Sequence, residues 1–291
     1  MQLKSRHETR ITSHRSRPAR GFTLPEMIVV IAITGIVASA VAVFIKRPVE
    51  GYVDAARRAE LTDIADTALR RMTRDIRTAL PNSIRVRQSG GAHYLEYLQT
   101  TGGGRYRSAP DSGGLGDPLD FTAADASFDV LGAGPVFTGQ RVVIYNLSAE
   151  EPAPPCAGGA ASTAGNAYAG DNLATGNGSG SAVTLAAAFQ YPLASPGKRF
   201  HVVDHAVTYE CNPATGELRR YWNYGINECQ APLPPAGGSS ALLATRVTDC
   251  SFTYATGGVT GRTGVVALTL QIEQSGEKVR LFQQAHVSNV P

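Results

Sequence analysis

The chain has 291 residues, of which 43% are hydrophobic and 18% are charged, and its formal net charge at pH 7 is +3. The positive sign comes from a basic leader, residues 1–20, which holds six Lys or Arg and one Glu; the remainder holds 21 basic and 23 acidic residues, a net charge of −2. Because no basic patch with interleaved aromatic residues remains, the composition argues against a nucleic-acid-binding protein.

An apolar segment follows the leader. Residues 24–45 contain one charged side chain, Glu26. As a helix this segment would be roughly 33 Å long, which is enough to cross a hydrocarbon core of about 30 Å. The basic leader predicts that the N-terminus stays in the cytoplasm and that the rest of the chain is exported. A carboxylate at the centre of a membrane helix costs about 2.5 to 3.5 kcal/mol, so we expect Glu26 to have a partner charge.

The residues around Glu26 carry a resemblance to a known family. They read Gly21-Phe22-Thr23-Leu24-Pro25-Glu26, followed by Met27-Ile28-Val29-Val30. This motif resembles the processing site of type IV pilins and type II secretion pseudopilins. The resemblance implies that prepilin peptidase removes residues 1–21 by cutting between Gly21 and Phe22, that the new N-terminus is methylated, and that Glu26 pairs with the N-terminal amine of a neighbouring subunit. Pro25 replaces the family's usual aliphatic residue, but proline is tolerated in a first helical turn.

A cleaved secretory signal peptide is the alternative for this segment. The basic leader, the apolar core and the small residues Ala38-Ser39-Ala40 fit that pattern too. Two features count against it: the carboxylate of Glu26 inside the apolar core, and the continuation of the apolar residues as far as Ile45.

Beyond Pro48, apolar residues recur at helical spacing and form one stripe. Its members are Leu61, Ile64, Ala65, Ala68, Leu69, Met72, Ile76 and Leu80. The pattern predicts that residues 24–80 form one helix of roughly 85 Å that ends at Pro81 and is kinked at Pro48. Residues 22–47 would be the transmembrane and assembly helix, and residues 48–80 an amphipathic helix that packs on the exported domain.

Residues 81–291 are rich in β-branched and aromatic runs separated by turns. Expected strands cover residues 83–87, 94–99, 140–146, 200–211, 217–224, 244–254, 264–273 and 278–288. The last two alternate in polarity and are joined by Gln274-Ser275-Gly276, which predicts an antiparallel hairpin. A long helix followed by strands predicts an α+β fold, with the helix covering one face of an antiparallel sheet. Residues 149–182, mostly Ala, Gly, Ser, Asn and Pro, are expected to form a flexible surface loop.

Four cysteines in an exported domain predict two disulfides, for which three connectivities are possible. They are Cys156, Cys211, Cys229 and Cys250. Short spacing favours Cys211 with Cys229. The positions of Cys211 and Cys250 at strand ends, and of Cys156 and Cys229 in Pro-rich loops, instead favour Cys211 with Cys250 and Cys156 with Cys229, and we prefer this second pattern.

Neither a metal site nor a catalytic site is predicted. His201 and His205 suggest zinc, but no Cys-x-x-Cys pair accompanies them, and residues four apart on a strand are better explained as exposed positions on one face. A solvated loop is favoured over calcium for the acidic residues, because they lack EF-hand spacing; these are Asp111, Asp117, Asp120, Asp125 and Asp129. No Gly-x-Ser-x-Gly motif is present, so we expect neither an enzyme nor a cofactor.

The resemblance extends into the exported domain. Residues 71–86, 207–211, 218–221, 249–254 and 286–291 are similar to MSHA-pilus biogenesis proteins of the MshO kind. This implies a type IV pilin-like fold and a minor pilin that primes or joins an MSHA-like type IV pilus. Alternatives are a minor pseudopilin of type II secretion, of the J kind, and an adhesin or ligand-binding module at a filament tip that uses residues 149–182 as its contact surface.

The same resemblance implies the partners and the location. The expected partners are prepilin peptidase, other minor and major pilins, the pilus assembly platform and the inner membrane, and no nucleic acid. The chain would first be a single-pass inner-membrane protein with a periplasmic C-terminal domain. It would then become part of a pilus at the cell surface.

Overall fold

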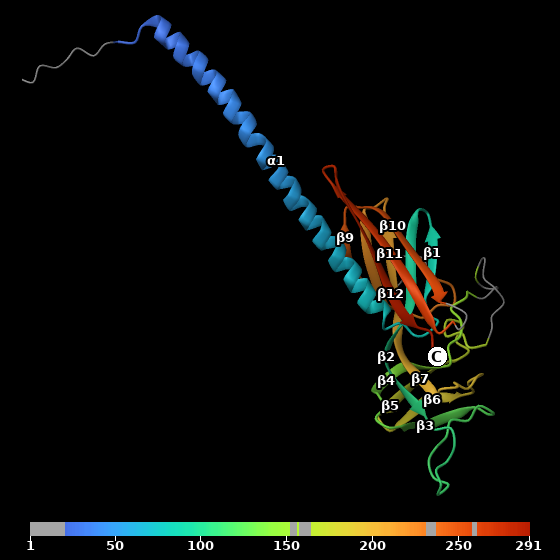
Figure 1. The fold of residues 1–291 in the computed structure, drawn as a ribbon. Coiled ribbons are helices and arrows are strands. Elements are labelled where there is room, and N and C mark those ends of the chain that lie inside the picture. Colours follow the sequence, from blue (N-terminus) through green and yellow to red (C-terminus); the bar gives the residue numbers. More distant parts are fainter. Residues whose placement is uncertain (1–20, 152–155, 157–163, 231–236, 258–260) are drawn as a thin grey trace, which may run out of the picture. The chain divides into compact units, whose positions relative to one another are not determined.

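The computed structural model describes residues 21–151, 156, 164–230, 237–257 and 261–291 (Figure 1). The chain divides into two compact units, Met1–Asp54 and Ala55–Pro291. A single long helix, α1 (Leu24–Ile76), begins in the first unit and ends in the second. Every strand described lies after it and all strand pairs are antiparallel, so the predicted α+β class is confirmed.

The second unit holds twelve strands among its described residues. They are β1 (Arg85–Ser89), β2 (Ala92–Tyr106), β3 (Asp125–Leu131), β4 (Val136–Ile144), β5 (Leu173–Ser179), β6 (Ala182–Phe189), β7 (Arg199–Asn212), β8 (Glu217–Tyr224), β9 (Ser239–Thr245), β10 (Val247–Gly257), β11 (Thr263–Gln274) and β12 (Glu277–Ser288). The predicted hairpin of β11 and β12 is present, closed by Ser275 and Gly276, both with positive φ.

Helix α1 ends at Ile76, so the predicted end at residue 80 was wrong. The next residues join strand β2 instead: the Leu80 N–H donates to the Leu98 carbonyl at 2.8 Å, and the Thr100 N–H donates to the Thr78 carbonyl at 2.9 Å. Pro81 disfavours a helical residue before it, which helps the chain to leave the helix here. The helix is continuous through Pro48, and the kink expected there stays a prediction.

The second half of α1 packs between two sheets. The predicted apolar stripe is confirmed: Leu61, Ala65, Ala68, Leu69, Met72 and Ile76 are each at most 2% exposed, and Ile64 is partly buried. These side chains share one core with residues of β2, β7 and β8 from the larger sheet and of β10, β11 and β12 from the smaller one. The helix thus contributes the centre of this core.

Polar contacts fix the same part of the helix to the larger sheet. Asp75 accepts a hydrogen bond from the Tyr209 hydroxyl at 2.7 Å, and its carboxylate lies 3.1 Å from the Arg220 Nε. Arg220 lies over the ring of Trp222 at 4.9 Å. Because Asp75 lies in α1, Tyr209 in β7 and Arg220 in β8, these bonds set how the helix sits on the strands.

Part of the larger sheet closes into a barrel, which the sequence did not predict. The pairings run β2–β3–β6–β5–β4–β7 and return to β2, so six strands form a ring. Figure 1 shows β3, β4, β5 and β6 grouped together, with the long strands β2 and β7 reaching from that group toward α1. A second core, rich in aromatic side chains, fills the ring and includes Tyr106, Phe128, Phe137, Tyr191 and Phe200.

The barrel corrects the expectation of a loop at residues 149–182. Residues 173–179 of that segment form β5, and β6 begins at Ala182, while 152–155 and 157–163 lie outside the described residues. The physical reason is steric, since a Cβ added to Gly178 would lie 2.3 Å from the Phe137 ring. Glycine is therefore required in β5 where the strand passes Phe137, although a glycine-rich segment looks unable to support a core.

The strand expected over residues 244–254 is likewise two strands. Arg246, with a φ of 62°, separates β9 from β10. Strand β9 pairs with β8 and β10 with β11, so the chain passes from one sheet to the other at this residue.

Candidate assembly motif

Glu26 lies in the first turn of α1. The Met27 N–H donates to the Thr23 carbonyl at 3.1 Å, which makes Thr23 the N-cap residue of the helix. The Thr23 N–H donates to the Glu26 carboxylate at 3.4 Å. A carboxylate three residues after a Thr N-cap that accepts the N-cap amide is one half of a capping box, and a negative charge there is stabilised by the helix dipole. The Thr-x-x-Glu spacing could have revealed this cap, and sequence reasoning missed it.

The expected processing site lies just outside the helix. Gly21 and Phe22 are not helical, and the Phe22 side chain is 75% exposed. A Cβ added to Gly21 would meet nothing within 4 Å. The Gly21–Phe22 peptide bond is therefore in non-helical, accessible backbone, the form in which a peptidase can reach a substrate.

The described part of the first unit, residues 21–53, buries none of its apolar side chains. All side chains described over residues 21–53 are exposed. By length and composition, α1 is a helix that could cross a membrane. The hydroxyls of Thr34 and Ser39 donate to carbonyls of the same helix, at Val30 (2.6 Å) and Ile36 (2.8 Å), so they satisfy their donors internally. The segment is thus suited to contact lipid or other apolar helices.

The second unit is crosslinked by two disulfides, Cys156–Cys229 and Cys211–Cys250, the same pairs that the sequence favoured. Cys211 lies in β7 and Cys250 in β10, so their bond joins the larger sheet to the smaller one inside the core that contains α1. Two disulfides are typical of an oxidising compartment.

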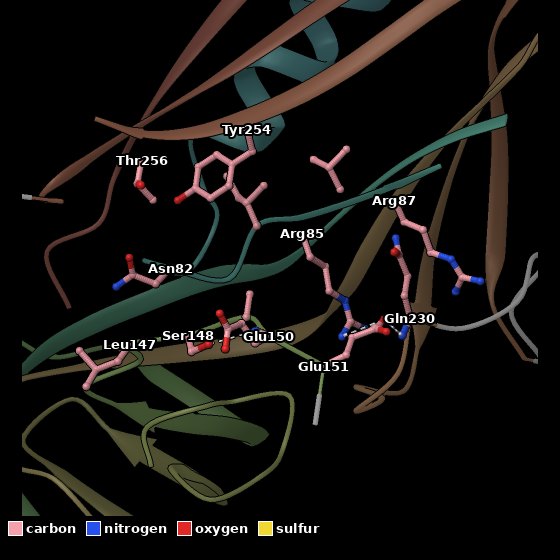
Figure 2. Close-up of a pocket in the computed structure, with 13 residues that line it drawn as sticks. Asn82, Arg85, Arg87, Leu147, Ser148, Glu150, Glu151, Gln230, Tyr254 and Thr256 are labelled. Carbon is pink, nitrogen blue, oxygen red and sulfur yellow. Dashed lines mark hydrogen bonds and ion pairs between the residues drawn. The ribbon is translucent and has the colours of Figure 1, made fainter. Parts of the chain in front are cut away.

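A groove of about 600 Å³ lies beside β1 and contains a buried arginine, Arg85 (Figure 2). Its guanidinium donates to the Glu96 carboxylate at 2.5 Å and to the carbonyls of Asn227 and Glu228 at 3.0 and 2.7 Å. It also lies over the Tyr168 ring, 3.7 Å from the centroid. Burial raises the pKa of Glu96, and the charge of Arg85 opposes that rise. Because each guanidinium nitrogen of Arg85 has an acceptor, this side chain holds residues 227 and 228, next to Cys229, against β1.

The remaining candidate residues serve the fold. The aspartates of the β2–β3 loop bond mostly to their own loop: Asp111 accepts the N–H groups of Gly113 and Leu115, and Asp125 accepts that of Asp120. His201 and His205 were expected to be exposed and are instead partly buried. No group of three or more His, Cys, Asp or Glu residues within the described ranges is arranged to hold a metal ion.

Among known protein families, the chain matches one in its N-terminal segment. Residues 16–42 match the family described as the prokaryotic N-terminal methylation motif. No curated protein and no solved structure matches the chain. The motif, the apolar helix that follows it and the antiparallel domain together support a type IV pilin-like or pseudopilin-like protein. Such a motif implies processing by prepilin peptidase and assembly with other pilins.

Proposed function

We propose that this chain is a minor pilin, processed between Gly21 and Phe22, that primes or is incorporated into a type IV pilus of the MSHA-like kind. One observation carries the proposal: the matched methylation motif, residues 16–42, extends into a helix whose described side chains are all exposed up to residue 53. Apolar surface on that scale requires a covering. Lipid supplies it before assembly, and the helices of other subunits supply it afterwards.

Glu26 is the assembly carboxylate in this proposal. In the isolated chain its carboxylate has a weak partner, the Thr23 amide at 3.4 Å. The charged N-terminal amine that processing creates on a neighbouring subunit would be a stronger one, since charge-assisted bonds are about twice as strong as neutral ones. Small residues at Gly35, Ala38, Ser39 and Ala42 let neighbouring helices approach.

The size of the exported domain favours a subunit that is present in few copies. Strands β3, β4, β5 and β6, with the long loop between β2 and β3, add a barrel to the helix-and-sheet core. Extra volume of this kind would crowd identical neighbours in a lattice, and a few copies near one end of a filament avoid that conflict. The periplasm before assembly, and the pilus at the cell surface after it, are the locations that this role requires of the domain.

A tip adhesin is the second candidate function, and the barrel is the observation that favours it. The barrel has its own core, and the β2–β3 loop is braced by aspartates and carries Leu115, which is 70% exposed. Binding of the purified protein to carbohydrate arrays or host surfaces would test this role. A minor pseudopilin of type II secretion shares the same anchor, and neighbouring genes would distinguish it.

Processing gives the direct test of the proposal. Intact-mass spectrometry of the membrane-extracted protein should find a mature chain that begins at methylated Phe22. Replacing Gly21 with Ala, the smallest change at the cleavage position, should leave the unprocessed precursor in the membrane, while the matched change Gly35→Ala should be processed normally. A mature end near Val41 would instead mean an ordinary signal peptide.

A further inference from the structure

A basic hollow lies on the outer wall of the barrel, where β2 pairs with β7. Its volume is about 340 Å³, and no acidic residue lines it. The residues that line it are Gly103, Gly104, Arg105, Leu131, Arg199, Phe200 and His201. Phe200 belongs to the barrel core, so its sequence neighbours Arg199 and His201 face outward.

Two arginines lie side by side on this wall, one on each of the two paired strands. Arg105 and Arg199 are direct partners in the β2–β7 register, and both are exposed. Like charges directly opposite on adjacent strands destabilise a sheet. Neither arginine forms an ion pair with any residue that the structure describes. Two carboxylates of the neighbouring strand segments are engaged elsewhere: Asp129 of β3 with Arg107 at 3.2 Å, and Asp204 of β7 with His205 at 2.8 Å.

His201 also lines the hollow. Its Nε2 is buried and has no hydrogen-bond partner among the described residues. A polar atom left in this way costs free energy unless a ligand or water reaches it. His201 is opposite Gly103 in the register, next to the pair formed by Arg105 and Arg199.

The shape of the hollow follows from how β2 passes the barrel. A Cβ added to Gly103 would lie 2.8 Å from the Phe200 carbonyl oxygen, so packing requires glycine there. Because Gly103 and Gly104 carry no side chain, the backbone of β2 lines the hollow there. Leu131, the partner of Arg105 on the β3 side, forms an apolar wall.

We propose that this hollow binds an oxyanion, the carboxylate, sulfate or phosphate group of an external ligand, held by Arg105 and Arg199 beside His201. Guanidinium groups match the planar oxygens of such anions and bind them with two parallel hydrogen bonds. The anion would neutralise the repulsion between the two arginines, which form no ion pair within the described part of the chain. The site is separate from the assembly motif, so it would give the subunit an external ligand whether or not it enters a pilus.

Equilibrium dialysis of the full chain in detergent tests the proposal, with radiolabelled sulfate, phosphate and glucuronate as separate probes at constant ionic strength. We expect saturable binding of at least one probe. The changes Arg105→Gln and Arg199→Gln should each weaken it about tenfold or more, because each removes charge-assisted hydrogen bonds to the anion. Arg280→Gln, which removes an exposed arginine from β12, is the matched control and should bind like the parent protein.

A second readout covers the possibility that a variant folds poorly. With isotope-labelled histidine in the otherwise unchanged chain, the bound anion should move the NMR titration of His201 to higher pH and leave that of His205 in place. His201→Gln assigns the signal. Binding that is absent for all three probes, or that survives both arginine changes, would overturn the proposal, as would a response of His201 to chloride at the same ionic strength.

Discussion

At the scale of single residues, Glu26 is expected to have one partner before assembly and another after it. The structure pairs it with the Thr23 amide of its own helix, and the proposed assembly replaces that amide with the amine of another subunit. Both roles lie in the first unit and neither involves the core of the second. The carboxylate is therefore expected to matter for assembly and not for the stability of the β-rich unit.

The change Glu26→Ala tests this expectation. The unfolding midpoint of the second unit should stay within experimental error of the parent protein, because the motif lies in the first unit and Glu26 is not part of the apolar core of the second. Incorporation into sheared filaments, measured by immunoblot, should fall. Glu50→Gln, which removes an exposed carboxylate paired with Lys46, is the control and should assemble normally. Equal incorporation of Glu26→Ala would show that charge pairing is not its role.

His201 predicts a dependence of stability on pH. Burial, with Arg199 nearby, lowers the pKa of this imidazole from 6.5 to about 4. Between these values the unfolded chain binds the proton and the folded chain does not, so the free energy of unfolding falls as the pH decreases from 6.5 toward 4. The contribution is on the order of 1 to 3 kcal/mol.

Comparing variants isolates that contribution. Urea unfolding of the parent protein and of His201→Gln at pH 7 and pH 4.5 should show a smaller loss of stability on acidification for the variant. His286→Gln, which changes an exposed histidine of β12, is the control. If His201→Gln lost as much stability as the parent, the imidazole would not be a neutral, buried group.

At the scale of secondary-structure elements, the packing of Gly178 in β5 gives a further prediction. Gly178→Ala should destabilise the second unit by about 1 to 3 kcal/mol, because the new methyl group would overlap the Phe137 ring. Gly225→Ala is the control, since a Cβ there would meet nothing within 4 Å and its φ is not positive. Chemical denaturation followed by Trp222 fluorescence measures both. Equal stability of the two variants would mean that the barrel relaxes around Gly178.

The elements that the sequence predicted are those with a clear period. The apolar stripe from Leu61 to Ile76 and the alternation in β11 and β12 each specify an element and its buried face. Strands β3, β5 and β6 were missed because about half of their residues are Ala, Gly, Ser or Asp, which have low β-propensity and give no clear alternation. In β5, Gly176 and Gly178 are fixed by contacts with β4 and β6 that no local pattern shows.

The candidate site divides in the same way. The cleavage position and Glu26 were readable because they lie in one continuous motif, and the cysteine pairing followed from the placement of Cys211 and Cys250 in strands. The basic hollow could not be predicted, because Arg105 and Arg199 are brought together only by the register of β2 and β7. Contacts set by a long-range register leave no local signal in sequence.

At the scale of the whole molecule, the two units differ in what stabilises them. The second unit has three apolar clusters and two disulfides. The first buries no apolar side chain within residues 21–53. A helix with this surface is complete only when lipid or another helix covers it, and the lipid bilayer gives no hydrophobic drive for helices to associate. Packing at small residues and pairing of Glu26 must therefore supply the contacts between subunits.

Crosslinking in intact cells tests this central claim most directly. A photoreactive residue in place of Gly35, on the small-residue positions of α1, should trap small pilin-like proteins at low abundance, identified by mass spectrometry. The same residue in place of Gln284, exposed on β12, is the matched control and should give a different set of products. Adding Glu26→Ala should remove the products formed from position 35. Only monomer, or long homopolymers of this chain, would contradict the account.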